Sequence, residues 1–387
     1  MQMQLDELKL LARAGQFGAI TLDTSIFEAH GLKLESGLIK QLEQFKDDST
    51  KLIISEIVQE ELLSHLTEKT KEVKKNVEDS LRKAKEYWKF DSQEIEKVKK
   101  SLFGGYEVEE FVSERFDEFI ENTSLEVIKA QDYLSVEDLI QKYFRAKPPF
   151  SETGKKKNEF PDAIALMSLE SWAIKNETKI IAVTLDNDWK NFSKDSKYLY
   201  CTDDLAGALG LFQLQDADDI CKYLYDKYER GSLVNLEIAI SNALDYQVSN
   251  IYIDPEVSSG FVYEEEETEI RVNGFTFKLF DDINTIFRPV NFDSDSLTVE
   301  SKLIVDVNIE CGFSFSVYDS IDKDYVAMGG NSIDTQTNLE VGVLITFAGD
   351  LNKVGTEIEI DDVEVEIPKA ISVDFGDLEP DWMYEDD

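Results

Sequence analysis

The chain has 387 residues, of which 80 are acidic and 40 are basic, and its formal net charge is −40. With 42% apolar and 11% aromatic residues it has the composition of a folded protein, and its length allows two domains with full hydrophobic cores. This acidity argues against non-specific binding of the whole chain to membranes or nucleic acid, so any polyanion must be met locally by lysines or a metal ion.

The negative charge is distributed unevenly along the chain. Residues 231–387 contain 35 acidic and 7 basic residues, a net charge of −28, whereas residues 1–230 contain 45 and 33, a net charge of −12. This change in composition predicts two domains, 1–230 and 231–387.

The cysteines and the N-terminus bear on the compartment. Three cysteines without ligand-like spacing, Cys201, Cys221 and Cys311, indicate reduced thiols in a cytoplasmic protein. Residues 1–14 are charged and amphipathic, unlike a signal peptide, and no apolar segment is long enough to span a bilayer, so we expect no membrane partner.

The first third of the chain alternates short apolar segments with helical patterns. Apolar spacing predicts a helix over residues 4–15, ended by Gly15, and buried strands over 19–23 and 52–54. We expect a loop and then a helix over 27–45, and a helix that starts at Ser55 or Glu56.

Residues 67–147 form a long, strongly charged insertion. Its Lys and Glu content and loose apolar spacing predict helices, with a hairpin that stands off the main body. An extended joint at 147–150 and a basic loop at 155–157 follow it.

Beyond the insertion the alternation of strands and helices resumes. A helix should begin at Pro161-Asp162 and run to about 175, because proline and an acidic residue both suit a first helical turn. Strands are expected at 179–184 and 198–200, and helices at 203–209 and 217–228. The order of elements predicts a parallel α/β sheet.

The pattern changes after Gly231. One more helix is expected over 233–244, after which apolar residues follow a period of two, which predicts an all-β sandwich or barrel. Its strands are expected at 251–253, 269–272, 275–279, 297–309, 312–318, 339–347 and 357–367.

Acidic residues recur where these elements end or begin. Asp23 follows the first strand, Glu60 and Glu61 lie on the helix after the second, Asp162 opens a helix, and Asp186 and Asp188 follow a later strand. All would meet at one edge of the sheet, where open α/β sheets bind ligands. Carboxylates gathered there would repel each other without a cation. A hard divalent ion neutralises them and activates water for phosphodiester hydrolysis.

Four stretches, 22–25, 57–62, 161–165 and 183–189, resemble in order the acidic motifs of PIN-domain nucleases. The resemblance covers about residues 17–215 and is closest to the PIN-like group with a helical insertion and a histidine four residues after the glutamate, here Glu61 and His65. It implies a Rossmann-like parallel sheet between helices, Mg²⁺ or Mn²⁺ dependence, and endonuclease activity, mostly on RNA.

The resemblance also implies roles for single residues. Glu61 fits the family spacing better than Glu60, and their directions on a helix differ by about 100°, so one of them faces the cleft. Either Asp186 or Asp188, or both, serves as the fourth acid. The implied catalytic residues are Asp23, Glu61, Asp162, Asp186 and Asp188, and all of these except Glu61 are implied metal ligands.

Polar and basic residues would support this set. Thr24 or Ser25 and Thr184 would orient carboxylates by hydrogen bonds, and His65 lies one helical turn after Glu61. Only two histidines occur, which argues against zinc. Substrate phosphates would be met by Lys155, Lys156, Lys157, Arg145 and Lys147.

The lysines of the insertion allow two interpretations. They either form a positive face for a phosphate backbone or belong to a solvated helix with internal ion pairs. These lysines are Lys69, Lys71, Lys74, Lys75, Lys83, Lys85 and Lys89.

Two functions follow from the sequence. The first is a metal-dependent endonuclease that acts on RNA or single-stranded DNA, as a regulated toxin or bacterial defence effector. The second is a non-catalytic scaffold with a degenerate nuclease fold. For the acidic β module the default is a solubilising surface with no specific role. The alternatives are recruitment of a protein partner, self-association, or occlusion of the cleft as a nucleic-acid mimic.

Overall fold

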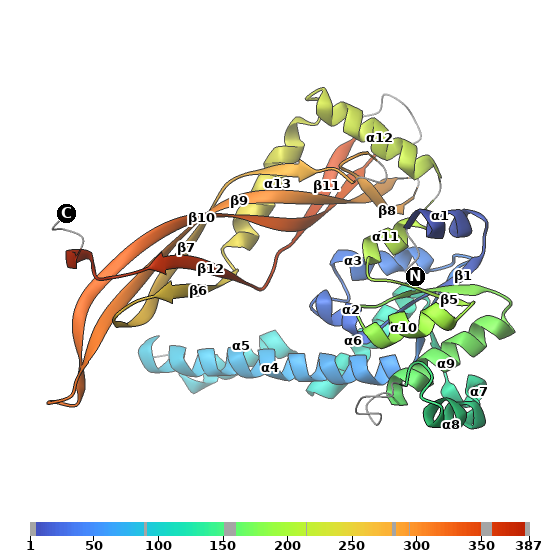
Figure 1. The fold of residues 1–387 in the computed structure, drawn as a ribbon, viewed down its shortest axis with the longest axis horizontal. Coiled ribbons are helices and arrows are strands. Elements are labelled where there is room, and N and C mark those ends of the chain that lie inside the picture. Colours follow the sequence, from blue (N-terminus) through green and yellow to red (C-terminus); the bar gives the residue numbers. More distant parts are fainter. Residues whose placement is uncertain are drawn as a thin grey trace. The chain divides into compact units, whose positions relative to one another are not determined.

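The computed structural model describes residues 5–88, 91–150, 160–213, 215–280, 284–293, 295–349 and 358–383. The chain forms two compact units, Met1–Phe212 and Gln213–Asp387 (Figure 1). Among the described residues no helix has both the length and the apolar character needed to cross a membrane.

The first unit is built on a five-stranded parallel sheet with the order β3-β2-β1-β4-β5. Apolar runs form its central strands because both faces of a parallel sheet are buried under helices. This confirms the predicted α/β fold. The strands are β1 (Phe17–Leu22), β2 (Lys51–Ser55), β3 (Glu126–Ile128), β4 (Lys179–Val183) and β5 (Leu199–Thr202).

The helices of this unit also follow the predicted order, with one correction near the start. The loop and helix expected over 27–45 are found at 30–36 and 37–45, but residues 27–29 are helical, because a helix begins directly at Thr24. The helices are α1 (Leu5–Arg13), α2 (Thr24–Ala29), α3 (Gly37–Lys40), the 3-10 helix η1 (Gln41–Phe45), α4 (Glu56–Trp88), α5 (Ser92–Phe103), α6 (Val108–Thr123), α7 (Ala130–Tyr133), α8 (Val136–Phe144), α9 (Phe160–Lys175), α10 (Asn187–Asp195) and α11 (Leu205–Gly210).

The insertion begins as an extension of a core helix. α4 runs unbroken for 33 residues, and α5 starts with a capping box at Asp91 (Figure 1). The return helix α6 buries Val112, Phe116 and Phe119, and the missed strand β3 pairs with β2. Only the distal part of α4 and α5 therefore forms the predicted hairpin, while α6 and β3 belong to the body of the unit.

The second unit is an antiparallel β module, as predicted. Its main sheet has the order β11-β10-β9-β7, with β8 also paired to β9, and β6 and β12 form a separate parallel pair. The elements are α12 (Gln215–Glu229), α13 (Val234–Val248), β6 (Tyr252–Ser258), β7 (Val262–Lys278), β8 (Arg288–Phe292), β9 (Ser296–Asp319), β10 (Asp324–Ala348), β11 (Glu359–Glu366), β12 (Ala370–Asp377) and the 3-10 helix η2 (Asp381–Met383).

The strands of this module are longer than expected. The segments predicted at 269–272 and 275–279 are both parts of β7, and those at 297–309 and 312–318 are both parts of β9. Alternate residues of β9 from Leu303 to Phe315 are buried, and α13 contributes the buried residues Leu236, Ile240, Leu244 and Val248 to the same core. α12, which precedes the boundary expected near residue 230, also packs into this core.

Candidate active site

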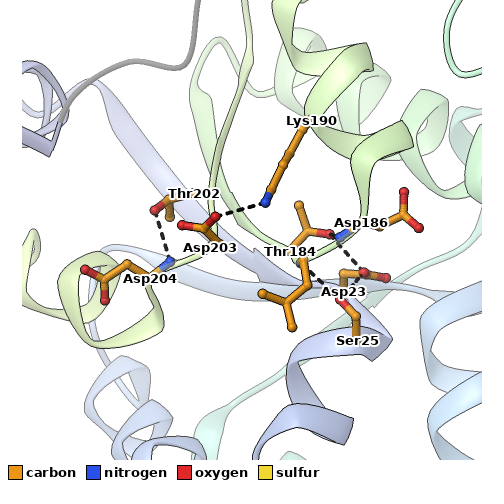
Figure 2. A network of polar contacts seen from close by, with 9 residues as sticks. Asp23, Ser25, Thr184, Asp186, Lys190, Thr202, Asp203 and Asp204 are labelled. Atoms are coloured by element: carbon orange, nitrogen blue, oxygen red, sulfur yellow. Dashed lines mark hydrogen bonds and ion pairs between the residues drawn. The ribbon is translucent and has the colours of Figure 1, made fainter. Parts of the chain in front are cut away.

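The site lies where the order of the sheet reverses. From β1 the chain proceeds outward through β2 and β3 on one side, and later through β4 and β5 on the other. Such a switch point leaves a crevice at the carboxyl ends of the two central strands. Asp23 follows β1 and Asp186 follows β4, so both carboxylates lie at that crevice (Figure 2).

Asp23 is held by two hydroxyl groups. Its side chain is only 6% exposed, and its Oδ2 accepts hydrogen bonds from Ser25 Oγ at 2.5 Å and from Thr184 Oγ1 at 2.9 Å (Figure 2). Burial raises the pKa of Asp23, the two hydroxyl groups oppose that rise, and the charge of Asp186 adds to it. A bound cation would therefore stabilise the ionised form of this buried carboxylate.

Asp162 approaches from the first turn of α9. The indole Nε1 of Trp189 donates a hydrogen bond to its Oδ1 at 3.0 Å. Burial raises the pKa of Asp162 to about 6, and the charges of Asp186, Asp23 and Glu61 contribute to the rise. Four carboxylates from four separate elements thus lie within electrostatic reach of one another.

Glu61 is the glutamate of α4 that faces this group. Its Oε2 accepts a hydrogen bond from Thr24 Oγ1 at 2.8 Å, and its side chain is partly buried, whereas Glu60 is exposed. The two residues point apart because they are consecutive on a helix. The structure therefore brings Glu61, and not Glu60, to the other acids.

Asp186 joins the site as the N-cap of α10. Its Oδ1 accepts the backbone N–H of Asp188, and its own N–H donates to Thr184 Oγ1 at 2.9 Å. Thr184 therefore connects Asp186 to Asp23. Asp188 lies in the first turn of α10, one residue before the buried Trp189.

The four carboxylates share one arrangement. In each, one oxygen accepts a hydrogen bond from a hydroxyl, indole or backbone donor. The donor comes from another segment of the chain for Asp23, Asp162 and Glu61, and from the same N-terminal turn of α10 for Asp186. A carboxylate fixed through one oxygen presents the other in a defined direction, as outer-shell donors do for metal ligands.

The donor set fits a hard divalent ion in chemistry, though it does not form a closed cage. Within the described parts of the chain, no three His, Cys, Asp or Glu side chains are grouped closely enough to hold a metal ion as they stand. Mg²⁺ commonly binds through one or two carboxylates and keeps several waters. An open, all-carboxylate site with one tethered oxygen per residue suits that mode of binding.

Other residues singled out in the sequence lie elsewhere or outside the description. His65 Nδ1 contacts Glu28 Oε1 on α2, so its recorded partner is not one of the four acids. Arg145 and Lys147 are exposed just after α8. Lys155, Lys156 and Lys157 lie outside the described residues.

Two contacts near the site were not expected from the sequence. One is the bond from Trp189 to Asp162, which joins residues 27 positions apart and leaves no local signal. The other is the pair of Lys190 Nζ with Asp203 Oδ2 at 2.9 Å, which lies beside the site (Figure 2). Asp203 follows β5 as Asp23 follows β1, so the same reading of strand ends would have placed it at this edge.

Comparison with known proteins bears on the same segment. Residues 20–189 match the family model described as PIN domain. No curated protein and no solved structure matches the chain. The resemblance inferred from the acidic stretches is confirmed: this segment is a PIN domain, the fold of a nuclease family.

Proposed function

We propose that the PIN unit is a metal-dependent endonuclease that hydrolyses phosphodiester bonds, with RNA as its substrate in preference to single-stranded DNA. The observation that carries the proposal is the gathering of Asp23, Glu61, Asp162 and Asp186 at the switch point of the sheet. Burial raises the pKa of Asp162 to about 6, and the charges of the other three carboxylates add to the rise.

Asp23, Asp162 and Asp186 would hold Mg²⁺ or Mn²⁺, with Asp188 as a further candidate ligand. When bound, such an ion neutralises the carboxylates, polarises a phosphate and lowers the pKa of a coordinated water.

The protein supplies the orientation of these groups. Ser25 and Thr184 fix Asp23, and Trp189 fixes Asp162. Glu61 is held through Oε2 by Thr24, so its other oxygen is directed for a hydrogen bond from the attacking water. Because these hydroxyl and indole donors already orient the carboxylates, less free energy is needed to order them when substrate binds.

The direct test is cleavage by the full chain. Matched RNA and single-stranded DNA oligonucleotides, labelled at one end, are incubated with Mg²⁺, with Mn²⁺ or with EDTA. We expect internal products from RNA that depend on the metal ion. Intact substrates under every metal condition would contradict the proposal and favour the scaffold function.

The two neighbouring glutamates give a matched pair of variants. Glu61→Gln should slow cleavage by about 10- to 100-fold, the usual effect of losing a group that orients a metal site or its water, whereas Glu60→Gln should change the rate less than about twofold. The rates are compared under single-turnover conditions. Equal rates for the two variants would remove Glu61 from the site.

We also propose that the enzyme acts in the cytoplasm as a regulated toxin or defence effector. Its three cysteines are free and buried, as in a reducing compartment. The β module, with a net charge of −28 over 231–387, would bind a protein partner or a second copy. Expression in bacteria should arrest growth with the wild type and not with Asp23→Asn, and equal growth would exclude a toxic activity.

A further inference from the structure

A groove lies at the base of the helical arm, which we define as residues 69–103 and which contains the distal part of α4 and all of α5. Its volume is about 440 Å³, and it is closed on its third side by α6. Four large apolar side chains along it are 44–60% exposed, which is unusual for residues that line one continuous hollow. They are Val73, Leu102, Tyr106 and Phe111.

The charge of the arm differs in sign from that of the whole chain. Residues 69–103 contain 11 basic and 7 acidic residues, a net charge of +4, against −40 for the chain. Lys74 lines the groove and lies over the Phe103 ring at 5.6 Å from its centroid. A polyanion that approaches this acidic protein is therefore favoured at the arm.

The acidic residues on the α6 side are partly neutralised. Lys71 Nζ contacts Glu109 Oε1 at 2.5 Å across the edge of the groove, and this lysine holds the pKa of Glu109 below its usual value. Glu107 and Glu110 are also exposed on that side. Exposed ion pairs contribute little free energy, so Lys71 can exchange Glu109 for a phosphate at small cost.

The groove and the candidate active site share one rigid element. Lys74 and Glu61 both lie on α4, and 13 residues of helix separate them by about 20 Å. That distance is about six stacked nucleotides at the 3.4 Å rise of one strand, and fewer if the strand is extended. A substrate bound at Glu61 would reach the groove only if it is longer than a few nucleotides.

We propose that this groove is a second binding site for single-stranded nucleic acid, in which a base stacks on Phe111 and the flanking phosphates contact Lys71 and Lys74. The inference rests on the proposed function for its substrate class. Aromatic rings beside lysines are the usual surface for sequence-tolerant binding of single strands. The arm thereby holds long substrates across the cleft.

Binding is measured by fluorescence anisotropy of the full chain in EDTA, so that cleavage is absent. The probes are oligouridines of about 20 and about 4 nucleotides, and an oligothymidine of about 20. In the triple variant Lys71→Gln, Lys74→Gln, Phe111→Ala, affinity for the long oligouridine should fall about tenfold or more, since one stacked base alone accounts for roughly 5- to 150-fold. The slope of log affinity against log salt should fall by about 1.4, for two lost phosphate contacts.

The matched control replaces two exposed lysines and one exposed aromatic residue on other surfaces: Lys33→Gln, Lys46→Gln and Tyr246→Ala. It should bind the long oligouridine like the wild type, and both triple variants should keep wild-type thermal melts. Wild-type affinity in the groove variant, or failure of the wild type to bind the long strands at all, would overturn the proposal. Comparison of oligouridine with oligothymidine tells whether the groove distinguishes RNA from DNA.

Cleavage separates this inference from the proposed function. With Mn²⁺, the groove variant should cleave the short oligonucleotide like the wild type and the long one with a KM raised about tenfold, matching its loss of binding. If the wild type binds long strands through the groove yet cleaves none, the binding site stands and the nuclease function fails. If the wild type and the groove variant cleave long and short strands equally well, the nuclease function stands and the groove proposal fails.

Discussion

Asp23→Asn should lower the rate of RNA cleavage by more than about 100-fold while the protein stays folded. Loss of a residue that only orients a metal ligand already costs about 10- to 100-fold, and Asp23 is proposed to bind the ion itself. Asparagine keeps the size of the side chain and an acceptor oxygen for Ser25 and Thr184. The expected loss therefore comes from the missing charge and not from a collapsed site.

Single-turnover cleavage and thermal melts, each with and without Mn²⁺, check this prediction. Mn²⁺ should raise the melting temperature of the wild type and have a smaller effect on the variant, because only a bound ion stabilises the native state. Asp203→Asn is the matched control, since Asp203 also follows a strand of this sheet but is paired with Lys190. Wild-type cleavage by Asp23→Asn would exclude this site as the source of activity.

Local signals in the sequence account for the sheet and the candidate acids. The runs at 19–22, 52–54 and 180–183 are apolar because both faces of their strands are covered, and each precedes a polar residue at the same edge. The preference for Glu61 over Glu60 also needed only the helical period and the family spacing. The inference of the sheet succeeds because strand burial is set by neighbours along the chain, and the different directions of Glu60 and Glu61 follow from helix rotation alone.

Other features depend on contacts between distant segments. The bond from Trp189 to Asp162 is made only after α9 and α10 pack together, and no spacing predicts it. β3 has three residues, too few for a periodic pattern. It forms a strand because its backbone pairs with the free edge of β2. In the second unit, two strands are predicted with a break before Gly312, yet β9 continues through it: Gly312 pairs with Ser332 of β10, and its neighbours Cys311 and Phe313 pair with β7 across a register shift.

Asp162→Asn should stabilise the protein in the absence of metal. The native pKa of Asp162 is raised from 3.8 to about 6, so the native state holds this proton more tightly than the unfolded chain does. Its contribution to stability is therefore fully present below pH 3.8 and is lost as the pH rises to about 6. Above that range, the buried charge destabilises the metal-free wild type, and the neutral asparagine does not.

The size and the pH window of this effect can both be measured. A shift of about two pKa units corresponds to roughly 3 kcal/mol, and partial exposure of Asp162 to water reduces it to about 1–2 kcal/mol. In EDTA at about pH 8, Asp162→Asn should thus melt about 2–6 °C above the wild type, and the difference should vanish near pH 4. A saturating divalent ion should reverse the order of the two melting temperatures. The ion stabilises the wild type by binding, and it binds the variant more weakly because the variant lacks the Asp162 carboxylate. A variant that melts below the wild type in EDTA at pH 8 would show that the charged form of Asp162 is already stabilised by Trp189, and that the site needs no cation to hold its carboxylates together.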